Sequence, residues 1–436
     1  MEPLFLAAIC GCNAGLYREA LHEVYIPRIQ RGDARFAANV LGARGTLLLV
    51  LSHFFENGRW GSLVETAVEE QSLTAEDQLF ILTQAALYLT TSRGMGSPEA
   101  RICHVRAEAL CHSLNRPMHL YVTLIGQWRY SSIHDKLSTT MQIAKRVYSL
   151  AQEQHNSAMT IGACRALTST LYHLGDFDIA QQYAMLGVEV WRSGGIQRQI
   201  DEVTAPAVAC LFFEALSEWH FAEISSAKTT MAKAIALAKE LNDMHGLAVA
   251  LYFSGCFGHF EGNCAEVERC GSDLIELSTR HNFELWLPAG SVLRGWARSA
   301  SGSLAEGIAW IENGLVEYRV TSSMLFLPYW LALKAEALHL AHCTSAALET
   351  IREAEALAEE REERWWSAEL HRLRAVFLAA MGADETQIDA SFCQAIRTAK
   401  RQKSVSLEKR AEATYAEYRR QKPSPLGGHR FQLPLW

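Results

Sequence analysis

Four glycines recur at a regular spacing through the second half of this 436-residue chain. Gly175, Gly262, Gly302 and Gly382 lie 87, 40 and 80 residues apart, which is close to two, one and two units of about 40 residues. Each glycine ends an apolar stretch and precedes a short polar link into a second apolar-periodic stretch. A fixed period of this size is typical of stacked helical hairpins, in which each unit packs mainly on its neighbours. We therefore expect an all-α fold.

The segment 158–191 shows one such unit. In its first half, apolar or small residues share one helical face because they recur every three or four positions, at Ile161, Cys164, Leu167, Leu171 and Leu174. Gly175 suits the end of this helix, since glycine adopts the left-handed conformation at low cost. Asp176 is placed to cap the second helix of the pair.

The same pattern predicts helices in pairs along most of the chain. These pairs are 75–89 with 98–114, 118–130 with 136–155, 207–219 with 221–241, 247–260 with 265–281, 287–299 with 304–318, 329–341 with 345–361, and 366–381 with 386–401, before a last helix at 406–420. We expect three regions: irregular N-terminal helical repeats over 1–70, the regular stack over 71–421, and an extended or disordered tail over 422–436. Proline and glycine in that tail exclude a helix there.

Composition narrows the classes of function. A net charge of −7 gives the whole chain no electrostatic reason to bind nucleic acid or a membrane surface. From Arg397 to the end there are ten Lys or Arg against three Glu. Two interpretations of this basic end remain: it binds an acidic surface, or, as we favour, it is a solvated terminal helix. Eleven scattered cysteines favour a reducing compartment, so we expect a cytoplasmic protein. No run of 18 apolar residues predicts a membrane span.

Positions within the unit resemble the tetratricopeptide repeat (TPR). The repeat pattern of leucine, glycine, aromatic residue and alanine falls on Leu167, Gly175, Phe177 and Ala180. Gly382, Phe392 and Ala395 take similar places later in the chain. The resemblance implies a right-handed superhelical α-solenoid of TPR-like helical hairpins, with units longer than the usual repeat of about 34 residues.

Three longer strings resemble a more specific group. Residues 166–191, 283–319 and 362–382 are similar to the helical region of bacterial STAND-type signal-transduction ATPases, a region that often follows a class III adenylate cyclase domain and an ATPase module. The likeness covers roughly residues 95–420. The family's phosphate loop is absent, because no Gly-Lys pair occurs in this chain. The resemblance therefore implies the sensor or docking arm without the ATPase or cyclase activity.

Candidate metal ligands do not converge. Cys103-His104 and Cys111-His112 lie eight residues apart, about 12 Å along one helix, which is too far to share a zinc ion. A second group shares one helical face but lacks a further ligand; it comprises His339, His342 and Cys343. Cys10 and Cys12 form only a bare CxC near the N-terminus. We expect no metal and no cofactor.

Catalytic arrangements are equally weak. Asp201-Glu202 and Glu362-Glu363 are adjacent acidic pairs that we interpret as solvated first turns of helices. No Gly-x-Ser-x-Gly elbow follows a predicted strand. We expect a protein that is not an enzyme.

Aromatic and arginine side chains on the first helix of each pair are the best binding candidates, because these helices line the concave groove in TPR arrays and such side chains often anchor partners. They are Trp128, Arg129, Arg165, Tyr172, Tyr252, Arg294, Trp296, His371 and Arg372.

Three hypotheses for function remain open. The first is a cytoplasmic scaffold of bacterial signal transduction whose groove binds a protein segment. The second is a regulator that senses a small metabolite inside the superhelix. The third is an orphan remnant of a cyclase or ATPase protein, because the first helix begins near Leu4 with little polar cap and its apolar end predicts a missing upstream domain or self-association.

Overall fold

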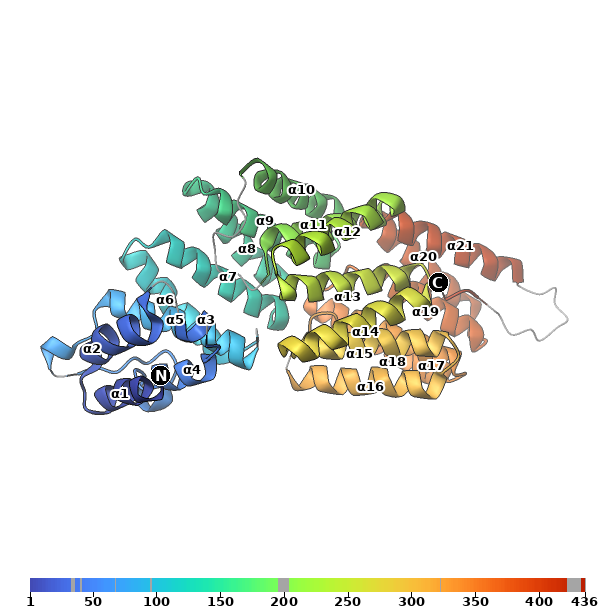
Figure 1. Cartoon of the computed structure of the whole chain (residues 1–436). Coiled ribbons are helices and arrows are strands. Elements are labelled where there is room, and N and C mark those ends of the chain that lie inside the picture. The colour runs from blue at the N-terminus through green and yellow to red at the C-terminus, as the bar shows by residue number, and fades with distance from the viewer. Residues whose placement is uncertain are drawn as a thin grey trace. The chain divides into compact units, whose positions relative to one another are not determined.

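A computed structural model describes residues 1–32, 36–39, 41–66, 68–94, 96–194, 204–321, 323–421 and 433–435. The chain divides into two compact units, Met1–Ile133 and His134–Trp436. Over the described residues both units are built from helices, with a single β-bridge between Phe55 and Leu63 and no strand (Figure 1). The predicted all-α class is confirmed.

The first unit begins irregularly and ends in three long helices. Its elements are α1 (Glu2–Asn13), α2 (Tyr17–Glu19), the π-helix η1 (Ala20–Gln30), α3 (Phe36–Asn39), α4 (Arg44–Ser52), the 3₁₀ turns η3 (Glu56–Gly58) and η4 (Glu69–Gln71), α5 (Ala75–Arg93), α6 (Pro98–Ser113) and α7 (Pro117–His134). A capping box starts α5, because the Thr74 hydroxyl accepts from the Asp77 N–H while the Asp77 carboxylate accepts from the Thr74 N–H.

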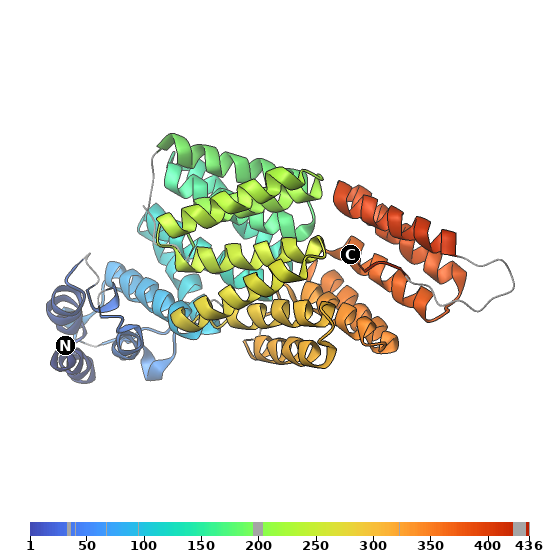
Figure 2. The ribbon, with the colours of Figure 1, turned by 45° about the vertical axis from the view of Figure 1, so that its right-hand side comes forward.

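The second unit contains fourteen helices over its described residues. They are α8 (Leu137–Glu153), α9 (Ser157–Leu174), α10 (Phe177–Gly194), α11 (Pro206–His220), α12 (Ile224–Glu240), α13 (Met244–Phe260), α14 (Cys264–His281), α15 (Trp286–Ala300), α16 (Leu304–Val320), α17 (Leu327–Leu340), α18 (Thr344–Arg361), α19 (Ser367–Ala380), α20 (Glu385–Arg401) and α21 (Val405–Gln421). Each helix packs on the next, and successive hairpins stack on one another (Figure 2). The predicted stack of helical hairpins is confirmed.

The turns inside the hairpins keep the predicted period. One residue in each turn has positive φ, at Gly175, Ala222, Gly262, Gly302, His342 and Gly382. From Ala222 onward these residues follow one another every 40 positions, whereas the first interval of 47 includes residues 195–203, which lie outside the described chain. In two turns of the series the positive-φ residue is not glycine but Ala222 or His342, so the glycine pattern in the sequence revealed only four of the six turns.

Local polar groups fix where several helices start. The side chains of Asn156, Asp243 and Asn263 each accept a hydrogen bond from a backbone N–H in the first turn of the following helix, at α9, α13 and α14. The predicted helix 221–241 was too long at its start, because the positive φ of Ala222 interrupts the helix and α12 begins at Ile224. Helix boundaries in this unit therefore follow turn conformation as well as apolar spacing.

Odd-numbered helices form the inner layer of the second unit. Neighbouring members of the series α9, α11, α13, α15, α17, α19 and α21 contact one another, and α21 also contacts α11. Large aromatic side chains of this layer and of the segment just before α19 are fully buried, namely Tyr172, Tyr252, Trp296, Tyr329, Trp330, Trp365 and Trp366. Aromatic packing therefore fills the inner layer and holds helices that are distant in sequence together.

Candidate functional site

Three of the predicted binding residues lie inside this aromatic layer. The Tyr172 hydroxyl lies 3.3 Å from His220 Nε2, the Tyr252 hydroxyl accepts from Trp330 Nε1 at 2.9 Å, and Trp296 Nε1 donates to Glu336 Oε2 at 2.7 Å. Burial raises the pKa of both tyrosines above the ordinary range. Their polar atoms already have partners within the chain, so in this conformation these side chains stabilise the inner layer.

Arg294 and His371 lie nearer the surface. Arg294 Nε donates to Glu268 Oε1 at 3.1 Å, and its guanidinium lies 4.6 Å from the centre of the Trp310 ring. His371 Nδ1 lies 2.7 Å from Glu355 Oε1. Both side chains are about a fifth to a quarter exposed, at 27% for Arg294 and 19% for His371.

The remaining predicted residues lie in different places. Trp128 is buried and Arg129 is half-buried on α7, in the first unit. Arg165 is buried on α9 in the second unit. Contact with a partner stays a prediction for each of the nine candidates.

Arg372 differs from the other eight because it holds a non-helical segment of the chain. Its Nε and Nη2 atoms donate to the two Glu369 carboxylate oxygens at 3.0 and 2.7 Å. Nη1 donates to the Thr414 hydroxyl at 3.2 Å and to the Pro434 carbonyl at 3.0 Å, and Nη2 also donates to the Leu435 carbonyl. A buried guanidinium therefore donates hydrogen bonds to two successive main-chain carbonyls.

We call Glu369, Arg372, Arg410 and Thr414 the Arg372 site. The first two residues come from α19 and the last two from α21, which pack against each other (Figure 1). Arg410 Nη1 also donates to Glu369 Oε1 at 3.3 Å. Although burial opposes it, the charges of Arg372 and Arg410 lower the pKa of Glu369 to about 2, so this carboxylate is ionised at neutral pH.

The turn between α20 and α21 closes the second unit against its early helices. Ser404 Oγ lies 2.7 Å from His220 Nδ1, and Lys403 Nζ donates to Asp178 Oδ2 at 2.6 Å. The guanidinium of Arg410 also donates to the carbonyl of Phe260 at the end of α13. These contacts join α21 and the turn before it to α10, α11 and α13, next to the Arg372 site.

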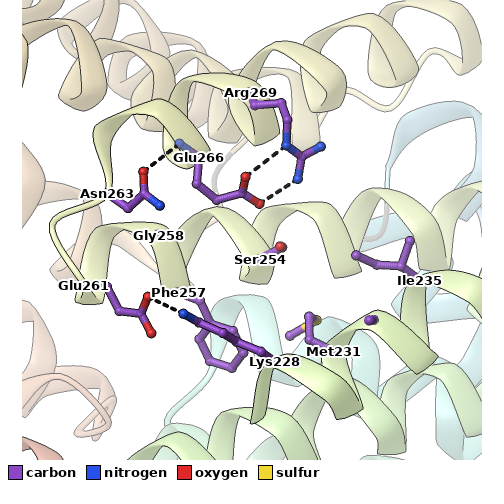
Figure 3. Close-up of a pocket in the computed structure, with 11 residues that line it drawn as sticks. Lys228, Met231, Ile235, Ser254, Phe257, Gly258, Glu261, Asn263, Glu266 and Arg269 are labelled. Atoms are coloured by element: carbon purple, nitrogen blue, oxygen red, sulfur yellow. Dashed lines mark hydrogen bonds and ion pairs between the residues drawn. The ribbon is translucent and has the colours of Figure 1, made fainter. Parts of the chain in front are cut away.

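A second candidate site is a pocket lined by residues of α12, α13, α14 and the turn between the last two, which we call the α12–α14 pocket. Its volume is about 360 Å³, and Figure 3 shows two ion pairs at its rim. Lys228 Nζ lies 2.7 Å from Glu261 Oε2, and Arg269 donates twice to Glu266, at 3.0 and 2.6 Å. The other lining residues are Met231, Ala232, Ile235, Ser254, Phe257, Gly258 and Asn263. The pocket thus has apolar walls and a rim of balanced charge.

Candidate metal ligands lie apart in the structure. Cys103 and Cys111 are buried free thiols of α6, and burial lowers the pKa of the neighbouring His104 to about 3. His339 Nδ1 lies 3.1 Å from the Thr344 hydroxyl. Over the described ranges, no three His, Cys, Asp or Glu side chains are grouped to hold a metal ion.

One interpretation of an acidic pair is wrong. Glu363 is buried, not solvated, and accepts from Phe326 N–H at 3.0 Å and from Trp365 Nε1 at 3.0 Å. Burial raises its pKa to about 7. Its neighbour Glu362 is a surface residue that accepts from Ser138 N–H at 2.8 Å, and Asp201-Glu202 lies outside the described residues.

No known protein-family model matches this chain. An uncharacterized protein of Rhizobium meliloti (strain 1021) is 26% identical over 203 residues, which are 47% of this chain and 20% of that protein. The chain therefore matches about a fifth of the length of this curated relative. The resemblance to STAND-type ATPases stays a prediction.

Several solved structures are similar at 13% identity. A Rap protein in complex with competence and sporulation factor gives a TM-score of 0.49 and covers 76% of this chain and 99% of its own. The apo form of RapI gives a TM-score of 0.29, and the match covers 69% of this chain and 97% of RapI. The Cut9–Hcn1 hetero-tetramer of APC/C gives a TM-score of 0.36, and the match covers 94% of this chain and 83% of the matched chain. These scores carry no argument about function. Within the described parts of the chain, no helix combines the length and apolarity needed to cross a membrane.

Sequence reasoning identified Arg372 but missed what it holds. Its acceptors at Pro434 and Leu435 lie 62 and 63 residues further along the chain, and no local periodicity connects them to α19. The available signal was the tail itself, whose final residues combine proline with leucine after a polar, glycine-containing stretch. That composition suits an extended segment able to lie against a helical surface.

Proposed function

We propose that this chain is a non-catalytic helical-repeat scaffold of bacterial signal transduction, acting in the cytoplasm, and that it binds an extended segment of a protein partner. The observation that supports the proposal is the Arg372 site. A buried, fixed guanidinium there donates to two consecutive backbone carbonyls of a segment that belongs to no helix. Main-chain hydrogen bonds of this kind give affinity for an extended peptide, and side-chain contacts add specificity.

The ionic surroundings of Arg372 make such recognition efficient. Glu369 fixes the guanidinium plane through two hydrogen bonds, so little side-chain freedom is lost when a carbonyl binds. Lysine at this position keeps the charge but loses the planar fork that reaches Glu369 and the carbonyls together. Arg372→Lys is therefore the informative variant, because it separates geometry from charge.

The test uses the full-length protein to recover bound proteins from its native source, followed by mapping of the bound segment with overlapping synthetic peptides. We expect a peptide with a micromolar Kd whose affinity falls at least tenfold in Arg372→Lys. Arg374→Lys is the matched control, since Arg374 lies on the same helix but donates to Glu355 and to Ser391. Equal affinity for wild type and Arg372→Lys, or no segment bound, contradicts the proposal.

A second candidate function is the sensing of a small metabolite, and the α12–α14 pocket favours it. Its volume of about 360 Å³ lies within the range of small-molecule sites, and its ion pairs offer both signs of charge to a ligand. A thermal-shift screen of charged metabolites tests it. A compound that stabilises wild type and Lys233→Met, but not Lys228→Met, supports this function, because Lys233 lies on the same helix outside the pocket lining.

Self-association is a further part of the proposal. Leu6 on α1 is 55% exposed, and it leaves apolar surface near the start of the chain. A concentration-dependent mass in light scattering that disappears in Leu6→Asp supports this contact. A mass that is independent of concentration in both proteins argues against it.

A further inference from the structure

We propose that the Arg372 site is a docking site for an extended apolar peptide containing a proline–leucine pair, and that Leu433–Leu435 of this chain is its resident, displaceable occupant. This inference rests on the proposed function and names the ligand class and its competitor. A partner segment must displace the chain's own residues before it can bind.

The hydrogen bonds define the main-chain part of the ligand. Arg372 Nη1 donates to the carbonyl of Pro434 at 3.0 Å, and Nη2 donates to the carbonyl of the next residue, Leu435. Inside an α-helix, before its last turn, these carbonyls would accept from N–H groups of the same segment. The occupant Leu433–Leu435 is non-helical, so both carbonyls are available to Arg372, and we infer that the ligand is extended.

Proline at the first of the two positions favours that state. Its ring fixes φ near the value of an extended polyproline conformation, and its nitrogen carries no hydrogen to donate. Pro434 is exposed, so it sets the backbone conformation while the side chain that follows is enclosed. A segment that is already extended loses less conformational entropy when it docks.

Leu435 supplies the side-chain part of the ligand. It is only 7% exposed, although it belongs to no helix. Burying a leucine side chain is among the larger single contributions that a short peptide offers. We expect the position after proline to require leucine or a similar aliphatic residue.

Charge restricts the ligand further. The site holds two guanidinium groups, on Arg372 and Arg410, against the single carboxylate of Glu369. The excess positive charge suits carbonyl oxygens and disfavours Lys or Arg next to the docked leucine. We therefore expect a ligand that carries no Lys or Arg beside the proline–leucine pair and that has an apolar side chain at the leucine position itself.

Because the resident segment is tethered, it competes strongly. Docking of a segment of the same chain is intramolecular, with an effective concentration on the order of millimolar, so a free peptide of similar affinity meets a site that is mostly filled. Weakening the contact between Leu433–Leu435 and the Arg372 site leaves the site open to a free peptide. Leu435→Asp does this with least damage, because it changes the occupant and leaves every residue of the Arg372 site in place.

The experiment measures fluorescence polarisation of a labelled peptide of residues 431–436, blocked at both ends, against full-length proteins. We expect Leu435→Asp to bind it at least tenfold more tightly than wild type. The double variant Leu435→Asp/Arg372→Lys should lose that gain. Val320→Asp is the control for a charge placed on an exposed apolar residue, since Val320 is 80% exposed on α16, and should behave as wild type. Unchanged circular dichroism and melting of each variant verify folding.

The outcomes separate the two proposals. Equal binding to wild type and Leu435→Asp, or binding that Arg372→Lys leaves unchanged, overturns the resident-occupant inference. If a partner segment found by peptide mapping binds wild type and Leu435→Asp equally, yet still depends on Arg372, the inference is wrong and the proposed function stands. If no segment depends on Arg372, both are wrong.

Discussion

Replacing Ala222 with glycine is expected to stabilise the second unit. Ala222 lies in the turn between α11 and α12 with φ of +64°, in the left-handed region that glycine adopts readily. An L-residue with a Cβ in this region costs about 1–2 kcal/mol relative to glycine. Glycine in turn makes the unfolded chain more flexible, which offsets about 0.4–1 kcal/mol of the gain. The net stabilisation is therefore about 0.5–1 kcal/mol.

The same chemical change elsewhere in this hairpin has the opposite sign. Ala236 is exposed within α12, where glycine destabilises a helix by about 0.5–1 kcal/mol relative to alanine. Ala236→Gly is therefore a matched control, since it deletes the same methyl group from the same hairpin. The two variants differ chiefly in the backbone conformation that the structure assigns to each position.

Urea unfolding followed by tryptophan fluorescence measures both variants. Nine of the eleven tryptophans lie in the second unit, so the signal reports mainly its unfolding. With a slope of about 3 kcal/mol per molar urea, Ala222→Gly should raise the midpoint by roughly 0.2–0.3 M and Ala236→Gly should lower it by a similar amount. If both variants lower the midpoint equally, the assigned turn and the 40-residue series are wrong.

Two further predictions concern the packing and the charges of the second unit. Gly295→Ala should lower the free energy of unfolding by about 1–3 kcal/mol in a thermal melt, because a Cβ at Gly295 would lie 2.6 Å from the Gly307 carbonyl oxygen, where α15 and α16 cross. Gly45→Ala is the control, because a Cβ at Gly45 meets open space, and it should show no such loss. Since the folded-state pKa of Glu363 is raised from 4.5 to about 7, its stabilising contribution is complete below pH 4.5 and is lost as pH rises through 7. Glu363→Gln keeps an oxygen to accept from the Phe326 N–H and should therefore be more stable than wild type at pH 8 by roughly 1–3 kcal/mol. In urea titrations this difference in the free energy of unfolding should shrink toward pH 5. A difference that stays constant across pH would refute the prediction.

Sequence periodicity predicted the helical pairs because each helix buries apolar residues at spacings of three and four positions. The regular spacing in α9, for example, places its apolar positions against neighbouring helices, and Gly175 ends the helix in the left-handed conformation as expected. Ala222 and His342 were missed because the sequence signal for a turn was glycine, whereas the fold imposes the same conformation on other residues. Tertiary packing fixes those turns, and a local pattern cannot show it.

The candidate site was harder to predict for a similar reason. Arginine and aromatic residues on the inner helices are compatible with both a binding groove and a packed core, and composition does not separate them. Burial of Tyr252 and Trp296 follows from contacts with α17, more than 30 residues away in sequence. Arg372 acquires its special role only because α21 and Leu435 approach it, and that approach depends on how the whole second unit closes.

Photo-crosslinking tests the central claim most directly, namely that the second unit binds an extended peptide at the Arg372 site. The probe is the peptide of residues 431–436 with a photoreactive leucine at the position of Leu435, added to the full-length Leu435→Asp protein, with the attachment point identified by mass spectrometry. We predict crosslinks on α19 and α21, close to Arg372 and Thr414, that disappear when unlabelled peptide is in excess. Crosslinks confined to other helices, or none that the unlabelled peptide removes, would contradict it.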